Sequence, residues 1–209
     1  MAMSDGTRKR LGRNEARERI LRAAARVYNE IGPGATVEDI AEEADYSPSA
    51  LYKHFSNKDD IFETLWRDMK KELLAVLEGE PPVELSFLDR LKWLLFELAE
   101  LADEKQEFFQ ASMANAPRPK PVAHMDESVT DIYWGFRETF EAIMQQGIDE
   151  GVLDDSRTAE TYALSLGGQI SALSDRWAME GPFPMKPRMK RLLELFLSGA
   201  TQPKADFNI

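Results

Sequence analysis

Residues 17–66 decide the fold, and they read RERILRAAARVYNEIGPGATVEDIAEEADYSPSALYKHFSNKDDIFETLW. From about Asn14 to Ile31, apolar residues recur at three- and four-residue spacing, which indicates one buried helix face. The glycines and proline of residues 32–34 then interrupt this pattern. The sequence therefore predicts a helix over residues 14–31.

Cap residues mark the starts of three further helices. Thr36 is followed three positions later by Asp39, as in a capping box. Ser47 precedes Pro48, and proline suits the first turn of a helix because its missing N–H is not needed there. Ser56 is expected to cap the fourth helix. These signals predict three helices in close succession, joined by short connections.

The turn between the second and third of these helices consists of Asp45 and Tyr46. An aspartate tolerates the left-handed backbone conformation better than most residues other than glycine, so the turn is expected to form. The ring of Tyr46 is expected to pack, with its hydroxyl exposed. Two helices joined in this way form a helix-turn-helix, whose second helix lies in the major groove of DNA.

The buried side of the predicted recognition helix is formed by Leu51 and Phe55, which leaves its other side chains to face DNA. The N–H groups at the start of the preceding helix are expected to hold a phosphate, and so is the lysine at the start of the following one. The DNA contacts expected from these positions are Thr36, Val37, Tyr46, Ser47, Pro48, Ser49, Tyr52, Lys53 and Lys58.

The rest of the chain is also helical in its pattern. A glycine- and proline-rich break at residues 79–82 is expected to join the head to the body, and the prolines of residues 117–121 exclude helix there. No alternating strand pattern competes, so we expect an all-α protein of about nine helices. The body helices are expected to begin at Ser86, at about Lys105, at about Asp126, at Asp155 or Ser156, and at about Pro187.

The distribution of charge favours a DNA-binding head. The chain has a net charge of −11, which by itself argues against nucleic acid, because affinity for DNA depends on Lys and Arg neutralising phosphates. Residues 1–26, however, hold eight basic and three acidic side chains. A basic head on an acidic body suits a protein that presents one end to DNA. A solvated helix face explains the same charges.

Several functional classes find little support in the sequence. The chain has no cysteine and two histidines, and it lacks a Gly-rich phosphate loop and the G-x-S-x-G and H-E-x-x-H motifs. We therefore expect no enzymatic activity, no cofactor and no metal site. The N-terminal residues lack the apolar run of a secretory signal, and no apolar segment is long enough to span a bilayer. A cytoplasmic protein without membrane contact is the expectation.

Two segments, TVEDIAEEA at residues 36–44 and LYKHFSNKDDIF at residues 51–62, closely resemble the DNA-binding domain of the TetR family of bacterial transcriptional regulators. The resemblance covers the first quarter to third of the chain. It departs from the family at the turn, where a glycine and a small branched residue are usual. It implies a DNA-binding domain with a basic N-terminal arm at residues 1–58, and an effector-binding and dimerisation domain at residues 59–209.

The resemblance implies roles for individual side chains of the head. Tyr52, His54 and Lys58 match residues that contact the sugar-phosphate backbone, and the start of the recognition helix matches the positions of base contacts. Any one of these three is by itself better explained as an ordinary packing or surface residue, but their joint spacing favours DNA contact. The basic arm, with Arg13 and Arg17, resembles extensions that touch the minor groove or flanking backbone.

For the body, the resemblance implies a cavity that holds a small-molecule effector. Aromatic and methionine side chains with few polar partners favour an apolar or aromatic ligand, although each is more typical of a core when taken singly. The candidates for the cavity lining are Phe96, Phe109, Met113, Trp134, Phe140 and Tyr162.

The resemblance further implies a homodimer formed by the last two helices. The interface residues expected are Leu166, Gly167, Ile170, Leu173, Trp177, Leu192, Leu193 and Phe196. The consecutive glycines Gly167 and Gly168 suit close approach of another backbone, which either a second copy or the same chain would supply. The implied activity is repression from a palindromic double-stranded operator that effector binding releases. The alternative is a helical interaction adaptor with a vestigial DNA-binding head.

Overall fold

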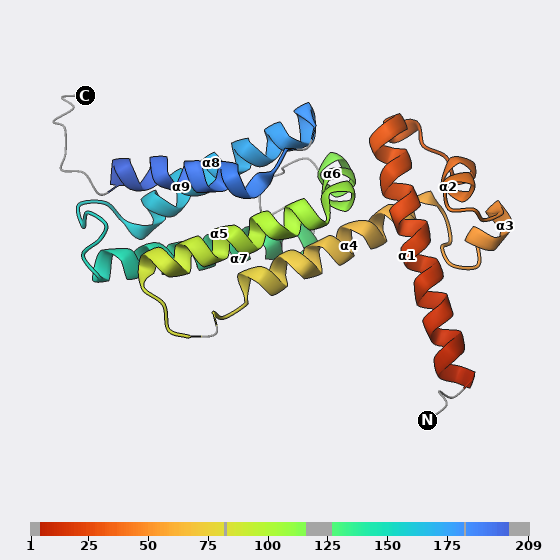
Figure 1. Cartoon of the computed structure of the whole chain (residues 1–209), viewed down its shortest axis with the longest axis horizontal. Coiled ribbons are helices and arrows are strands. Elements are labelled where there is room, and N and C mark those ends of the chain that lie inside the picture. Colours follow the sequence, from red (N-terminus) through yellow and green to blue (C-terminus); the bar gives the residue numbers. More distant parts are fainter. Residues whose placement is uncertain (1–4, 82, 116–126, 182, 201–209) are drawn as a thin grey trace. The chain divides into compact units, whose positions relative to one another are not determined.

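The computed structural model describes residues 5–81, 83–115, 127–181 and 183–200, so the proline segment at 117–121 lies outside it. Side chains are described for these residues except 5–11, 112–115, 127–130, 178 and 179. Within the described residues the chain forms nine α-helices, one short 3-10 helix and no strand (Figure 1). The predicted all-α fold is therefore confirmed.

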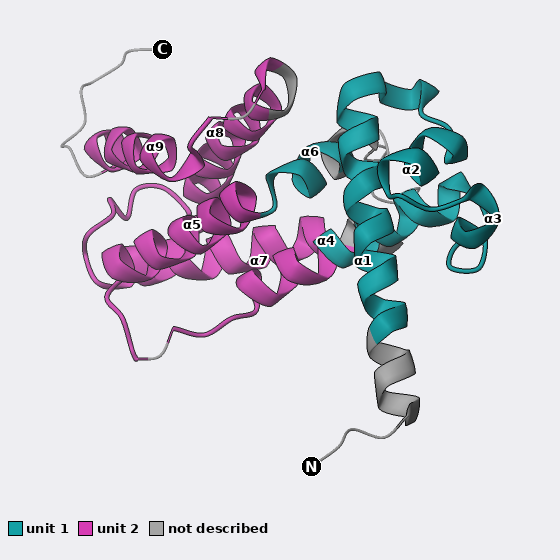
Figure 2. Cartoon of the chain, turned by 45° about the vertical axis from the view of Figure 1, so that its right-hand side comes forward, with its two compact units in different colours: residues 1–69, 105–117 teal, residues 70–104, 118–209 magenta. Residues whose placement is uncertain are grey.

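The chain divides into two compact units, coloured separately in Figure 2. Unit 1 comprises residues 1–69 and 105–117, and unit 2 comprises residues 70–104 and 118–209. The predicted boundary between a DNA-binding and an effector-binding domain at residue 58 stays a prediction. The compact unit that contains the head continues to Met69 and includes a second segment of the chain. The helix α4 (Lys58–Leu77) contributes residues to both units.

Unit 1 is built on α1, which runs from Asp5 to Ile31 and so begins nine residues before the predicted start. The prediction began where apolar residues start to recur, and the residues before that point lack this spacing. The 3-10 helix η1 (Gly32–Gly34), α2 (Val37–Glu43) and α3 (Pro48–Leu51) follow. The core of unit 1 contains the fully buried Ile20, Ala24, Ile40, Leu51 and Phe55.

Two of the three predicted caps are confirmed. Thr36 accepts a hydrogen bond from the Asp39 backbone N–H, and the Asp39 carboxylate accepts from the Thr36 backbone N–H, which completes a capping box. Ser47 Oγ accepts from the Ala50 N–H at 3.2 Å. The expectation that Ser56 caps α4 is wrong. Asn57 Oδ1 accepts from the Asp60 N–H at 2.8 Å, because the helix starts one residue later than expected.

The helix α6 (Gln106–Asn115) belongs to unit 1, although the sequence placed it in the body. Ala111 is buried in the unit 1 core, and Phe108 packs against that core. The side-chain amide of Asn29 in α1 donates to the Glu107 carbonyl oxygen at 3.1 Å. The core of the head is therefore completed by a helix far away in the sequence.

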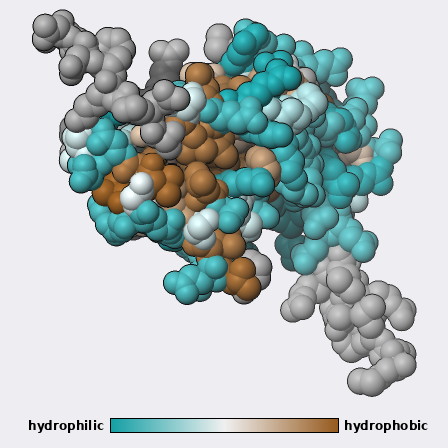
Figure 3. All heavy atoms as spheres, turned by 60° about the vertical axis from the view of Figure 1, so that its left-hand side comes forward, coloured by the Kyte–Doolittle hydropathy of each residue, from teal (hydrophilic) through white to brown (hydrophobic). Residues whose placement is uncertain are grey.

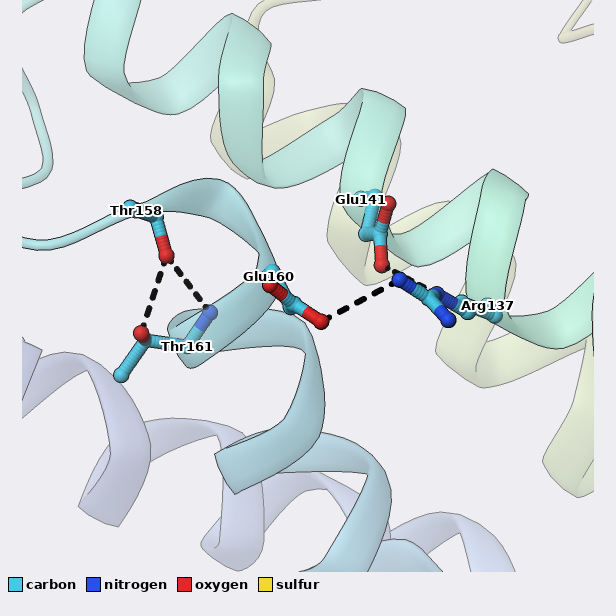
Figure 4. Close-up of polar contacts among 5 residues, drawn as sticks. All are labelled: Arg137, Glu141, Thr158, Glu160 and Thr161. Atoms are coloured by element: carbon cyan, nitrogen blue, oxygen red, sulfur yellow. Dashed lines mark hydrogen bonds and ion pairs between the residues drawn. The ribbon is translucent and has the colours of Figure 1, made fainter.

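Unit 2 contains α5 (Phe87–Glu104), α7 (Glu127–Asp149), α8 (Ala159–Glu180) and α9 (Met185–Ala200). The predicted start of α8 at Asp155 or Ser156 is wrong. The Ser156 N–H and hydroxyl both donate to the Asp154 carboxylate, which closes a turn before the helix. Thr158 is the cap, because its hydroxyl accepts from the Thr161 N–H (Figure 4).

The helices of unit 2 are joined by close packing and by polar contacts. Figure 4 shows Arg137 of α7 between Glu141 of its own helix, at 2.7 Å, and Glu160 of α8, at 3.1 Å. Gly147 of α7 lies directly against the Phe87 ring, since a Cβ on this glycine would be 2.8 Å from two ring carbons. The α5–α7 pair can approach this closely only because residue 147 has no side chain.

Candidate nucleic-acid interface

The turn of the helix-turn-helix forms as expected. Asp45 has a φ of +57°, and it is the one residue other than glycine with positive φ among the described residues. The Tyr46 N–H donates to the Ala41 carbonyl oxygen at 2.8 Å, which closes the turn. The exposed Asp45 carboxylate forms an ion pair with Arg19 of α1. An aspartate therefore replaces the usual glycine in the left-handed position.

The recognition helix presents the predicted face to its surroundings. Leu51 of α3 is buried, as expected for the inner side; Phe55 is also buried, but it follows the helix, which ends at Leu51 and is shorter than predicted. On the other side Pro48, Ser49 and Lys53 are exposed, and Tyr52 is 52% exposed. The side chains expected to contact DNA from this helix are thus accessible in the single chain, and their contact with DNA stays a prediction.

Some of the residues expected to contact DNA already use their polar groups in hydrogen bonds within the chain. The Thr36 N–H and hydroxyl both donate to Asp39 within the capping box, and Val37 is buried. The hydroxyl of Ser47 lies 3.0 Å from that of Ser49 while it caps α3. These residues therefore shape the ends of α2 and α3, and the outward surface is formed mainly by residues 48–53.

Tyr46 packs as expected, since its ring lies against the unit 1 core. The ring faces His54 edge-on, with 6.3 Å between the two ring centroids. The guanidinium carbon of Arg19 lies 5.6 Å from the Tyr46 ring centroid. The turn is consequently held by an aromatic contact, a cation–π contact and an ion pair in addition to its backbone hydrogen bonds.

His54 is half-buried at the end of the recognition segment. Its Nδ1 is buried and has no hydrogen-bond partner among the described residues. Burial lowers the pKa of His54 below its ordinary value of 6.5, and the nearby cations Arg13, Arg17 and Lys53 lower it further. A neutral imidazole is therefore favoured at neutral pH.

Two of the cations expected to bind phosphates have partners within unit 1. Arg17 donates from Nη1 to the His54 carbonyl oxygen at 2.7 Å, and Lys58 Nζ donates to the carbonyl oxygens of Pro33 and Ala35 at 3.1 and 3.0 Å. Arg13 is exposed. Sequence reasoning missed the role of Arg19, because its partner Asp45 is separated from it by 26 residues and no sequence pattern links the two positions.

The candidates for the effector cavity are distributed between the units. Phe109 is half-buried in unit 1, and the side chain of Met113 lies outside the described residues. In unit 2, Phe140 and Tyr162 are buried, whereas Trp134 is 36% exposed. The Tyr162 hydroxyl donates to the Asp154 carbonyl oxygen. Phe96 lies half-buried, with the ammonium of Lys186 5.6 Å from its ring centroid.

The candidates for the dimer interface differ in accessibility. Leu166, Trp177, Leu193 and Phe196 are buried within the single chain, so their side chains belong to the core of unit 2. The other four candidates are half-buried, and they are Gly167, Ile170, Leu173 and Leu192.

Two leucines that the sequence analysis did not single out are exposed on the same helices, Leu164 of α8 at 76% and Leu195 of α9 at 69%. Among the described residues, nothing lies within 4 Å of a Cβ placed on Gly167 or Gly168. Within the described part of the chain, a tight intramolecular contact therefore does not explain these glycines. Apolar residues also gather in one area of the face seen in Figure 3.

No helix in the described part of the chain is long and apolar enough to cross a membrane. Residues 20–65 match the family model for bacterial regulatory proteins of the tetR family. The HTH-type transcriptional regulator AcrR of Shigella flexneri is 22% identical to this chain over 171 residues, which cover 78% of each protein.

Solved structures share the fold over nearly the whole chain. The ketosteroid transcriptional regulator KstR2 of Mycobacterium tuberculosis has a TM-score of 0.71 at 20% identity and covers 90% of this chain and 95% of its own. The regulator FadR of Bacillus subtilis, solved in complex with stearoyl-CoA, has a TM-score of 0.66 at 19% identity and covers 87% and 98%. The match to the tetR family model thus covers residues 20–65 of the head, and the likeness to these solved structures shows that the whole chain shares their fold.

Proposed function

We propose that this protein is a repressor that binds a palindromic operator as a homodimer and releases it when a small apolar effector binds. The observation that carries the proposal is the accessible face at residues 48–53, fixed from behind by the buried Leu51 and Phe55. A short helix with this exposure fits the width of the major groove. Tyr52 provides a hydroxyl and Lys53 a cation that can contact phosphates of the DNA backbone.

The dimer is proposed to form through the outer faces of α8 and α9. The exposed Leu164 and Leu195 supply apolar area there, and the open Gly167 and Gly168 allow a second backbone to approach closely. This surface differs from the one predicted from sequence, because half of the predicted side chains are buried in the single chain. A two-fold axis at this surface would present two recognition helices to two half-sites.

The effector is proposed to bind among the aromatic side chains of unit 2 and to act on unit 1 through α4 and α6. Helix α4 contributes residues to both units, and α6 completes the core of unit 1 directly after α5 of unit 2 in the sequence. An effector releases DNA only as far as it binds the two states differently. KstR2 is named for ketosteroids and FadR was solved with stearoyl-CoA, which supports apolar probes.

The DNA-binding proposal is tested by selecting from a pool of random duplexes with the wild-type protein. We expect an enriched palindrome whose half-sites lie about one helical turn apart. Lys53→Ala should weaken binding of the selected duplex about tenfold, while Lys71→Ala, an exposed lysine of unit 2, should leave it unchanged. Failure to enrich any sequence above the background of the pool refutes the proposal and favours the adaptor.

The effector is tested separately by adding stearoyl-CoA or a ketosteroid to the complex with the selected duplex. We expect one of them to raise the dissociation constant for DNA at least fivefold, with no effect on binding of a random duplex at low salt. Sedimentation should show a dimer at micromolar concentration. A monomer that still binds a single half-site would contradict the dimeric part of the proposal.

A further inference from the structure

The segment from Asp45 to His54, which holds the turn and the recognition helix, depends on outside support. Helix α3 within it is four residues long, and so short a helix has little stability of its own. Backbone hydrogen bonds extend it loosely to Phe55, whose N–H donates to the Leu51 carbonyl oxygen. The position of segment 45–54 is therefore set by its neighbours.

Arg17 of α1 holds the C-terminal end of this segment. Its Nη1 donates to the His54 carbonyl oxygen at 2.7 Å, and its guanidinium carbon lies 4.3 Å from the ring centroid of the buried Phe55. The planar guanidinium can make both contacts at once, since it donates in its plane and stacks with its face. A lysine ammonium at this position cannot reproduce that combination.

Arg19 of α1 holds the other end of the segment. It forms the ion pair with Asp45, the residue in the left-handed turn position, and its guanidinium lies over the Tyr46 ring. Tyr46 in turn meets His54 edge-on. The two ends of segment 45–54 are thus connected to one helix by two arginines that lie two positions apart.

We propose that Arg17 and Arg19 are positioning residues that fix the recognition segment on α1, and that Arg17 supports DNA binding without touching DNA. The inference rests on the proposed function and reassigns Arg17, which the sequence resemblance placed among the DNA contacts. The Arg17 contact is partly buried and resists salt, whereas the Arg19–Asp45 pair is exposed and weakens as salt is added.

The test replaces each arginine by lysine, which keeps the charge that attracts DNA. Arg17→Lys and Arg19→Lys are compared with Arg22→Lys, because Arg22 lies exposed on the same helix and pairs with Glu18 within α1. With the duplex selected by the wild-type protein, we expect about tenfold weaker binding for Arg17→Lys and a smaller loss for Arg19→Lys. Arg22→Lys should match the wild type.

Two further measurements separate positioning from phosphate contact. Loss of a phosphate contact lowers the slope of log affinity against log salt by about 0.9. Because Arg17 is proposed to make no such contact, the slope should stay at its wild-type value in Arg17→Met. Without DNA, amide hydrogen exchange at residues 47–55 should be faster in Arg17→Lys than in Arg22→Lys. A slope lowered by about one unit in Arg17→Met overturns the inference.

Equal exchange and equal affinity in Arg17→Lys and Arg22→Lys would also overturn it. Failure of the wild-type protein to select any duplex would instead refute the proposed function. The exchange measurement would still decide whether the two arginines hold the segment, so the two failures are distinguishable.

Discussion

Replacing Gly147 by alanine has two opposing effects on the stability of the fold, overpacking against Phe87 and a gain in helix propensity. A Cβ there would lie 2.8 Å from two Phe87 ring carbons and 2.9 Å from Leu153 Cδ1, well inside ordinary contact distance. Overpacking of a buried site costs about 1–3 kcal/mol. Alanine also gains up to about 1 kcal/mol over glycine inside a helix. Since Phe87 is fully buried and held by its backbone hydrogen bonds to Glu150, we expect overpacking to exceed the helix gain.

The expected net loss is about 1–2 kcal/mol, or roughly 2–8 °C in the melting temperature of a chain of this size. Thermal unfolding followed by circular dichroism measures it. Gly12→Ala in α1 is the matched control, because nothing within the described residues lies within 4 Å of a Cβ at that position. The control should be neutral or slightly stabilising. A Gly147→Ala protein as stable as the control would refute the packing argument.

Three other changes have definite expected outcomes. Thr36→Ala removes the capping box of α2 and should cost about 1 kcal/mol in urea unfolding, while Ser198→Ala at an exposed position serves as its control. Because the pKa of His54 is lowered, the unfolded chain takes up a proton first as the pH falls below about 6.5. The stability of unit 1 should therefore be fully present above that pH and decrease below it, and a His54→Gln protein that kept the same pH profile would contradict this cause. Gly168→Leu has open space in the single chain, so the variant should still fold to a helical protein by circular dichroism, whereas sedimentation should show weaker self-association; an undiminished dimer would exclude this face.

The local features of the head could be predicted because short-range chemistry determines them. The capping box joins Thr36 to Asp39, three positions later, and the left-handed turn position depends on the residue type at Asp45 itself. The start of α4 was misplaced by one residue because Ser56 and Asn57 are both good caps, and side-chain type alone does not choose between them. The start of α8 was misplaced because the Ser156 N–H donates to the Asp154 carboxylate in a turn that precedes the helix.

Contacts between distant segments could not be predicted. Nothing in the pattern of α6 distinguishes a helix that packs on α1 from one that packs in the body, since both bury an apolar stripe. The pairing of Arg19 with Asp45 likewise requires the fold to bring them together. Burial of Leu166 and Trp177 in the single chain depends on which side of α8 meets its neighbours, and helical spacing gives only the existence of that side.

The inclusion of α6 in unit 1 limits how such regulators can be recombined. A chimera that joins residues 1–69 to the body of a relative would remove Ala111 and Phe108 from the surface they cover and would expose apolar side chains of α1. A chimera that transfers DNA specificity therefore has to take residues 105–115 from the same parent protein as the N-terminal segment, so the exchange has to include two separate segments of the chain. A single exchange near Met69 yields a head without the α6 side chains that complete its hydrophobic core.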